Sequence, residues 1–179
     1  MRSEIGVTSQ FELWAEKAGY SVTESSSEDG RAIVWNSGGE IRYFIGKGAE
    51  EWIVVTSSER MGKEEFVLAS PLPDLIERKF LAIFARLVRS HSGLVRLSRP
   101  TSTAHLAAGY SVGVQHFWGK DRRTLIDSQG RVIAVVSGGE LVGTVNAVEL
   151  SLFASHTSDA IVQSMMDPAG KPLFSVRNG

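Results

Sequence analysis

The hydrophobic positions near the start of the chain repeat with the period of an α-helix. They form one stripe at i, i+3, i+4 and i+7: Phe11, Trp14, Ala15 and Ala18. Ser9 and Glu12 have the spacing of a capping box, in which each side chain satisfies a backbone amide left open at a helix start. Gly19 follows the stripe and favours a helix end. A short amphipathic helix is therefore expected to open the chain.

Short apolar runs separated by glycine-rich turns follow the polar loop at 25–29. They predict three strands: residues 31–36, 41–46 and 51–57. In the second run, Ile41, Tyr43 and Ile45 alternate with Arg42 and Phe44, which is the period of two expected of a strand. This part of the chain is therefore expected to form antiparallel hairpins.

A longer helical pattern begins after the proline-rich segment 70–74 and runs to about Ser90. Its expected buried face carries four residues: Ile76, Phe80, Ile83 and Leu87. Residues 94–106 contain Pro100 and predict a crossover. Three more strands are expected within residues 109–117 and 124–136.

The pattern becomes helical again from Leu141. The predicted apolar face has four members: Leu141, Val145, Val148 and Leu152. Thr157 is expected to cap a last helix. These elements predict an α+β fold, with a mainly antiparallel sheet and several helices packed on it. We expect one domain over residues 1–179, or two lobes at about 1–92 and 93–179, with Gly-Tyr-Ser-Val at 19–22 and 109–112 as a weak sign of internal duplication.

Composition narrows the classes of function. The 179 residues are 42% hydrophobic, which is enough to bury a core, and the absence of cysteine excludes disulfides and thiolate metal sites. The longest apolar run, residues 80–85, is too short to span a bilayer, and no secretion signal opens the chain. We therefore expect a cytoplasmic protein with no membrane partner.

Charge is nearly balanced, at −1 overall, so nucleic acid is not an expected partner. The segment 78–99 is a local exception, because it contains six basic residues and no acidic one: Arg78, Lys79, Arg86, Arg89, Arg96 and Arg99. The preferred interpretation is a solvated helix face and its following loop. The alternative is a nucleic-acid-binding accessory protein that uses residues 78–99, although no aromatic residues are interleaved there for base stacking.

The strongest enzymatic motif is Gly109-Tyr110-Ser111-Val112-Gly113, a Gly-x-Ser-x-Gly sequence followed in order by Asp127 and His156. A nucleophile elbow needs a helix after the serine, whereas apolar alternation here continues toward Phe117 as in a strand. A small serine hydrolase is thus the alternative function. The four histidines are scattered, so we expect no metal and no cofactor.

Two segments have features of protein recognition. The predicted loop 115–123 places an aromatic anchor among basic residues, and tryptophan and arginine are enriched at interface hot spots. Residues 56–61 run from the end of a predicted strand into a loop, and they carry polar side chains of mixed charge. The candidate partner-binding residues are Glu59, Arg60, Met61, His116, Trp118, Lys120, Arg122 and Arg123.

Several landmarks together resemble a known family. Gly-Arg-Ala-Ile-Val-Trp-Asn and Gly-Gly-Glu-Ile-Arg-Tyr-Phe-Ile lie within residues 30–45, Thr-Ser-Ser-Glu-Arg-Met at 56–61, Thr-Leu-Ile-Asp-Ser at 124–128 and Gly-Lys-Pro-Leu-Phe at 170–174. In this order, the landmarks are similar to those of the mycobacterial immunity factors for tuberculosis necrotizing toxin, and the likeness runs from about Leu13 to Phe174.

The resemblance implies a non-enzymatic function. Members of that family are cytosolic antitoxins of a secreted NAD⁺ glycohydrolase, and they bind the catalytic domain of the toxin and block its NAD⁺ site. By resemblance, this chain would be such an inhibitor, bound one-to-one to a cognate toxin. A stable inhibitory interface of this kind buries roughly 1,600 Å² in total.

Overall fold

One antiparallel sheet of eight strands organises the chain, in the order β1-β2-β3-β4-β5-β8-β7-β6. The computed structural model describes residue 5 and residues 7–177. The strands are β1 Tyr20–Thr23, β2 Ala32–Asn36, β3 Ile41–Lys47, β4 Ile53–Glu59, β5 Glu65–Ser70, β6 Ser111–Phe117, β7 Lys120–Ile126 and β8 Val132–Val136. The helices are α1 Ser9–Lys17, α2 Pro73–His91, α3 Glu140–Ala154 and α4 Ser158–Met166. The α+β prediction is confirmed.

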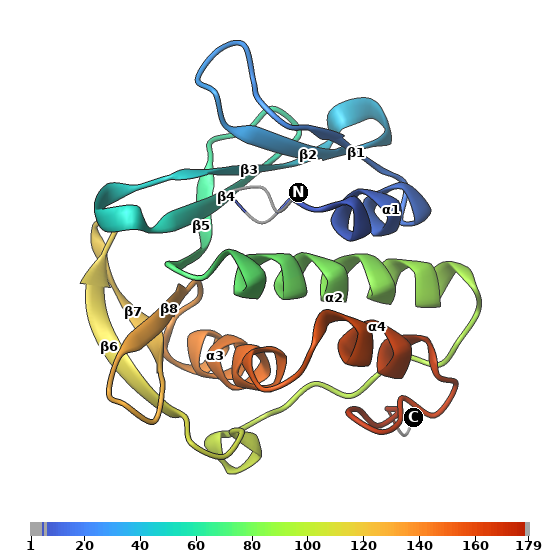
Figure 1. Cartoon of the computed structure of the whole chain (residues 1–179), viewed down its shortest axis with the longest axis vertical. Helices are drawn as coiled ribbons and strands as arrows, with labels where there is room; N and C mark the ends of the chain where they lie inside the picture. The colour runs from blue at the N-terminus through green and yellow to red at the C-terminus, as the bar shows by residue number, and fades with distance from the viewer. Residues whose placement is uncertain (1–4, 6, 178–179) are drawn as a thin grey trace.

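The sheet bends between its two halves (Figure 1). β5 and β8 are joined by two residue pairs, Leu68 with Val136 and Ala69 with Val135, whereas β3 and β4 pair along seven residues. The half formed by β6, β7 and β8 therefore turns away from the plane of β1–β5. The helices lie on one side, with α2 running between the first half of the sheet and the pair α3 and α4.

The core lies between the inner face of the sheet and α2. Phe11 of α1 contacts both Phe80 and Phe84 of α2, with ring centroids 5.1 and 5.2 Å apart. Tyr43 of β3 meets Phe80 edge-on at 5.3 Å, and burial raises the pKa of Tyr43 to about 12. The period of two in β3 is confirmed, because Arg42 lies on the opposite face, over the ring of Phe44.

Local capping signals were only partly informative. Pro73 occupies the first turn of α2, and the Thr157 hydroxyl accepts the amide of Ala160 at the start of α4, both as predicted. The predicted capping box of α1 is wrong. Thr8, one residue earlier, is the N-cap and accepts the amide of Phe11, while its own hydroxyl donates to buried Glu77 of α2.

Two strands have no counterpart among the sequence predictions. Only two residues separate β1 from the end of α1, and β5 follows the segment 61–64, so neither was recognised as a separate strand. The two Gly-Tyr-Ser-Val segments lead into the two edge strands, β1 and β6. The Ser-Gly-Gly-Glu segments differ, however, because 37–40 joins two strands and 137–140 enters α3. This echo therefore does not correspond to a repeated structural unit.

The predicted apolar face of α3 is wrong at its start, because the Leu141 side chain is 82% exposed. Val148 is buried as predicted, and Leu152 packs against the core, but the core residues of the helix also include Ala147, Leu150 and Phe153, which the prediction left out. Its sequence is apolar on nearly every side, so periodicity alone did not identify the buried face.

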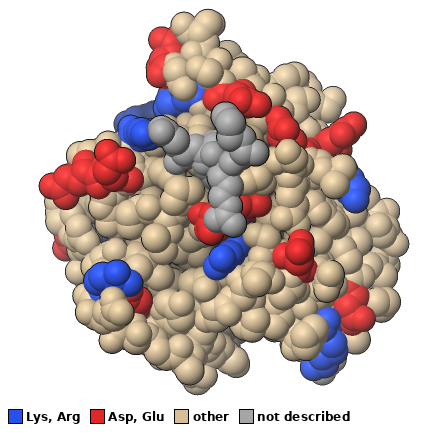
Figure 2. Space-filling view, in the orientation of Figure 1, with Lys and Arg blue, Asp and Glu red and all other residues tan. Residues whose placement is uncertain are grey.

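The basic run in residues 78–99 is divided among several environments. Arg78 donates to the carbonyls of Phe153 and Ala154 at the end of α3, and Arg89 is buried. Lys79, Arg86 and Arg99 all pair with Glu149, and they form with it what we call the Glu149 cluster. The predicted solvated face is therefore only partly right. Figure 2 shows acidic and basic side chains interspersed over one face of the molecule.

Candidate docking surface

The segment predicted as a loop at 115–123 is a tight hairpin. Phe117 pairs with Lys120, so only Trp118 and Gly119 form the turn between β6 and β7. Both have positive φ, 53° and 75°, which is the geometry of a two-residue type I′ turn. Glycine adopts this conformation freely, whereas in a tryptophan it costs about 1 kcal/mol. The chain thus holds an indole at the hairpin tip in a strained backbone position.

The hairpin tip packs on the outer face of the sheet, opposite the helices. The Phe117 ring lies 5.7 Å from that of Trp52 and 5.6 Å from that of Phe66 on β5. Trp118 lies 5.8 Å from Phe66 and remains 53% exposed. The Arg122 guanidinium sits 4.2 Å above the Phe66 ring and donates to the Phe117 carbonyl at 2.9 Å. We call these five residues the hairpin platform.

The electrostatics of the hairpin platform are dominated by Arg122. Partial burial lowers the pKa of its guanidinium, because the charged form loses part of its hydration. The ring of Phe66 compensates through a cation–π contact. A cation over an aromatic face, beside a half-exposed indole, is a surface suited to anchoring another protein.

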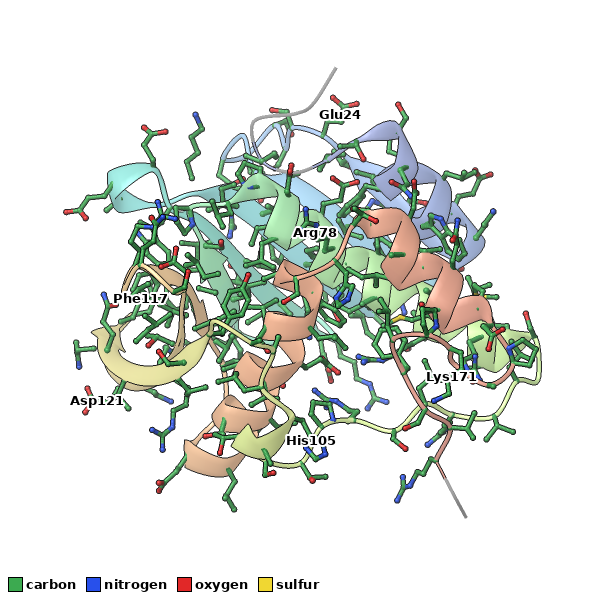
Figure 3. The ribbon with its side chains drawn as sticks, turned by 60° about the horizontal axis from the view of Figure 1, so that its bottom comes forward. Glu24, Arg78, His105, Phe117, Asp121 and Lys171 are labelled. Atoms are coloured by element: carbon green, nitrogen blue, oxygen red, sulfur yellow. The ribbon has the colours of Figure 1, made fainter. Side chains whose placement is uncertain are left out.

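The other predicted residues of this hairpin do not all share that face. His116 lies 2.9 Å from Asp121 on the exposed surface, and Lys120 is exposed. Arg123 alternates with Arg122 along β7, so it points toward α3 and pairs with Glu140 at 3.0 Å. In Figure 3, Phe117 and Asp121 lie in this hairpin, on the opposite side of the view from Lys171. The predicted set therefore divides between the two faces of the hairpin.

Glu59, Arg60 and Met61 form a separate surface at the turn between β4 and β5. Arg60 and Met61 both have positive φ, and the Arg60 amide donates to the carbonyl of Glu40 at 2.7 Å. Met61 is 78% exposed. Among the described residues, no hydrogen bond, ion pair or ring contact joins this turn to the hairpin platform. Trp52 precedes the opposite end of β4, roughly 20 Å away at 3.3 Å per residue.

Sequence reasoning missed three of the aromatic residues beneath the hairpin tip. Phe66 lies in an unpredicted strand, while Trp52 and Phe117 belong to predicted strands but were assigned no role. Trp52 and Val54 alternate along the outer face of the sheet. That alternation was a usable signal, but it could not show which distant strand would cover it.

The Gly-x-Ser-x-Gly motif at 109–113 does not form a catalytic site, which corrects the hydrolase alternative. Ser111 opens β6, with no helix after it. The His156 ring bonds to the Leu152 carbonyl, and Asp127 accepts from Arg131. A cavity of about 780 Å³ is lined by Asp127 but by neither Ser111 nor His156. In residue 5 and residues 7–177, no hydrogen bond links Ser111, Asp127 and His156.

Within the described part of the chain, no group of three or more histidine, aspartate or glutamate residues is arranged to hold a metal ion. No described helix has both the length and the apolar character needed to cross a membrane.

Comparison with known proteins decides the family. Residues 14–173 match the family described as Immunity protein 61. The chain belongs to this family. The match covers nearly the whole length of this chain, and it confirms the resemblance to immunity proteins that was noted in the sequence.

Two curated relatives support the assignment. They are the Immunity factor for TNT of Mycobacterium tuberculosis (strain ATCC 25618 / H37Rv) and the Immunity factor for TNT homolog of Mycobacterium bovis (strain BCG / Pasteur 1173P2). Each is 36% identical over 173 residues, covering 96% of this chain and 94% of the relative. The solved structure of Rv3902c from M. tuberculosis is 35% identical, with a TM-score of 0.88 over 96% of this chain and 95% of that one.

As an Immunity protein 61 member, the chain has the role of an immunity protein, that is, a non-enzymatic inhibitor. The prediction that it is not an enzyme is therefore confirmed, and the serine hydrolase alternative is wrong.

Proposed function

We propose that this chain is the cytoplasmic antitoxin of a secreted NAD⁺ glycohydrolase, and that it binds the catalytic domain of that toxin one-to-one and blocks its NAD⁺ site. The observation that carries the proposal is the near full-length similarity to two immunity factors for TNT. The mechanism is steric: a rigid domain covers the cleft through which the dinucleotide would enter.

Such a mechanism needs a rigid surface with a few strong anchors. A stable inhibitory interface buries roughly 1,600 Å² in total, and its energy is concentrated in a few buried aromatic and arginine side chains. The hairpin platform offers Trp118 and Arg122, both held in place before binding by Phe66. Preorganised anchors lose little conformational entropy on association, which favours tight binding.

The strained turn supports the same choice of surface. Trp118 occupies a backbone conformation that glycine would adopt at lower cost, yet its ring is half exposed and contributes little to the core of the free protein. Strain retained without a matching gain in stability is typical of functional positions. We therefore assign the central contact to Trp118, with Lys120 and His116 at the rim and the turn at 59–61 as a second contact.

The assay is the loss of NAD⁺ catalysed by a necrotizing-toxin catalytic domain. Hydrolysis should stop when this chain is present at an equal concentration, and undiminished hydrolysis at a large excess of the chain would refute the proposed function.

The role of Trp118 can be tested separately in the same assay. Trp118→Ala should raise the inhibition constant roughly 30-fold, the effect of losing a hot spot of about 2 kcal/mol. Leu13→Ala is the matched control, because Leu13 is 49% exposed but lies on α1, across the sheet from the hairpin platform. If the wild-type chain inhibits and Trp118→Ala inhibits equally well, the toxin is bound through another surface.

A further inference from the structure

A basic cavity lies away from the hairpin platform, beside the second half of α2. Its volume is about 660 Å³, and the crossover at 94–101 and the C-terminal tail form its other walls. Five arginines and no acidic residue line it: Arg86, Arg89, Arg96, Arg99 and Arg177. We call this cavity the arginine groove. Figure 1 and Figure 3 both show the yellow-green crossover passing beside the red tail.

The floor of the arginine groove is fixed by Arg89, which is 2% exposed. Its guanidinium donates to the carbonyls of Val95, Met165, Asp167 and Pro168, at 2.5 to 2.8 Å. These bonds tie the crossover and the turn after α4 to α2. The groove is therefore a built feature of the fold, and four of the five N–H groups of Arg89 are used within the protein.

Two arginines of the arginine groove face each other directly. Leu97 and Val176 form an antiparallel bridge, and the Arg177 amide donates to the Arg96 carbonyl at 2.8 Å. Arg96 and Arg177 are consequently opposite residues on one face of this pairing, with Cβ atoms about 5 Å apart. Like charges in this position are destabilising. Neither guanidinium has a hydrogen bond or ion pair with another residue within the described range 7–177.

The nearby acid does not neutralise this pair. Glu149 is the acidic partner of Arg86 and Arg99, and it also binds Lys79. One carboxylate is thus shared among three cations. Arg96 and Arg177 add two further positive charges at the mouth of the groove, so the site has an excess of positive charge that an external anion would offset.

We propose that the arginine groove binds an anion carrying two or more phosphate groups. Guanidinium groups bind phosphate oxygens in pairs of parallel hydrogen bonds, and Ser90 and Thr101 also line the groove. The volume is within the range of small-ligand sites. No aromatic side chain lines it, so a nucleobase would have no stacking partner and the phosphates are the groups recognised.

Calorimetric titration with sodium diphosphate and sodium tripolyphosphate tests the proposal on the purified chain. We expect one site, tighter for tripolyphosphate and weakened by added salt. Arg96→Gln and Arg177→Gln should each weaken binding roughly tenfold, because each removes charge-assisted hydrogen bonds. Lys63→Gln, which removes the same charge from the exposed turn between β4 and β5, should bind as the wild type does.

Thermal unfolding separates a binding role from a structural one. Arg177→Gln should unfold at the same temperature as the wild type or higher, because it relieves the like-charge contact with Arg96. Diphosphate should raise the unfolding temperature of the wild type but not that of the double variant with Arg96→Gln. A lower unfolding temperature for Arg177→Gln without ligand would indicate a structural arginine and overturn the proposal.

Further ligands identify the source of the phosphates. Binding of free diphosphate without binding to vesicles that contain cardiolipin, whose headgroup carries two phosphates, supports a small-molecule ligand, and vesicle binding lost in Arg96→Gln supports a lipid headgroup. Polyglutamate that binds as tightly as tripolyphosphate would overturn phosphate recognition. Affinity for single-stranded DNA that keeps rising with strand length would do the same. Failure of diphosphate to bind also overturns it, while toxin inhibition in the assay above would be unaffected.

Discussion

Removing the Glu149 carboxylate should destabilise the protein more than most single substitutions. Glu149 is 1% exposed on the side of α3 that faces α2. Its oxygens accept from Lys79 at 3.2 Å, Arg86 at 2.5 Å and Arg99 at 3.2 Å. Glu149→Gln keeps the shape of the side chain but leaves three cations around a neutral group.

The magnitude follows from the burial of this cluster. Loss of one partner from a buried ion pair typically costs 3–5 kcal/mol, because the remaining charge stays desolvated. Lys79 and Arg86 are partly accessible, with side-chain exposures of 18% and 29%, so we expect about 3 kcal/mol. For a chain of this length, that corresponds to a fall of roughly 6–12 °C in melting temperature.

The lowered pKa of Glu149 sets the direction in which stability should change with pH. Burial alone would raise the pKa of Glu149, but the charges of Lys79, Arg86 and Arg99 outweigh it and hold the pKa well below the ordinary value. A carboxyl whose pKa is depressed by folding stabilises the protein above its unfolded pKa, about 4.3, and this contribution is lost as pH falls below that value. Glu149→Gln should remove this part of the acid sensitivity.

Urea unfolding at pH 7 and at pH 3.5 is the appropriate measurement. Glu140→Gln is the control, since Glu140 pairs with Arg123 at 3.0 Å but is 82% exposed, and exposed pairs contribute at most about 1 kcal/mol. A Glu149→Gln variant within 1 kcal/mol of the wild type at pH 7 would refute the reasoning, because the cations would then be sufficiently hydrated without their acid.

The remaining predictions concern the core and two arginine contacts. Leu141→Ala should change the free energy of unfolding by less than about 0.5 kcal/mol, whereas Leu150→Ala, at a buried position of the same helix, should cost about 3 kcal/mol by urea unfolding; equal losses would contradict the observed orientation of α3. Arg89→Lys should destabilise by at least about 2 kcal/mol, because an ammonium group cannot reach all four carbonyls; an unchanged melting temperature would show that these bonds are unimportant. A hydrogen bond from Arg31 lowers the pKa of Glu64 to about 2, so stability contributed by that pair should be complete above pH 4.3 and lost as pH falls toward 2. The check is an acid titration of the wild type and of Glu64→Gln in which NMR monitors the carboxyl groups. A Glu64 carboxyl with a pKa near 4.3 would contradict the prediction.

Short-range signals predicted much of the fold. Pro73 at the start of α2 and the Thr157 cap of α4 were recognisable because capping depends on residues within one helical turn. β1 and β5 were not predicted, since both depend on pairing with β2 and β4 rather than on a distinctive local pattern. Strand propensity is strongly dependent on such neighbours.

The candidate docking surface was predictable only in part. Trp118 was identified from its residue type and its basic neighbours, and the structure places it at an exposed hairpin tip. Its contact with Phe66 was not predictable, because the two residues are far apart in sequence and meet only when β6 and β7 fold across the outer face. Pattern within a strand indicates which side chains share a face, but not what covers that face.

The basic residues from Arg78 to Arg99 show most clearly what the sequence determined and what only the tertiary structure decided. The sequence by itself determined that six cations lie there without an acid among them, and that most belong to one helix. Only the tertiary structure decided that three of them pair with Glu149 and that Arg89 is buried among carbonyls. It also placed Arg96 opposite Arg177. The physical reason is that charges interact through space, so counter-ions are set by packing between distant segments.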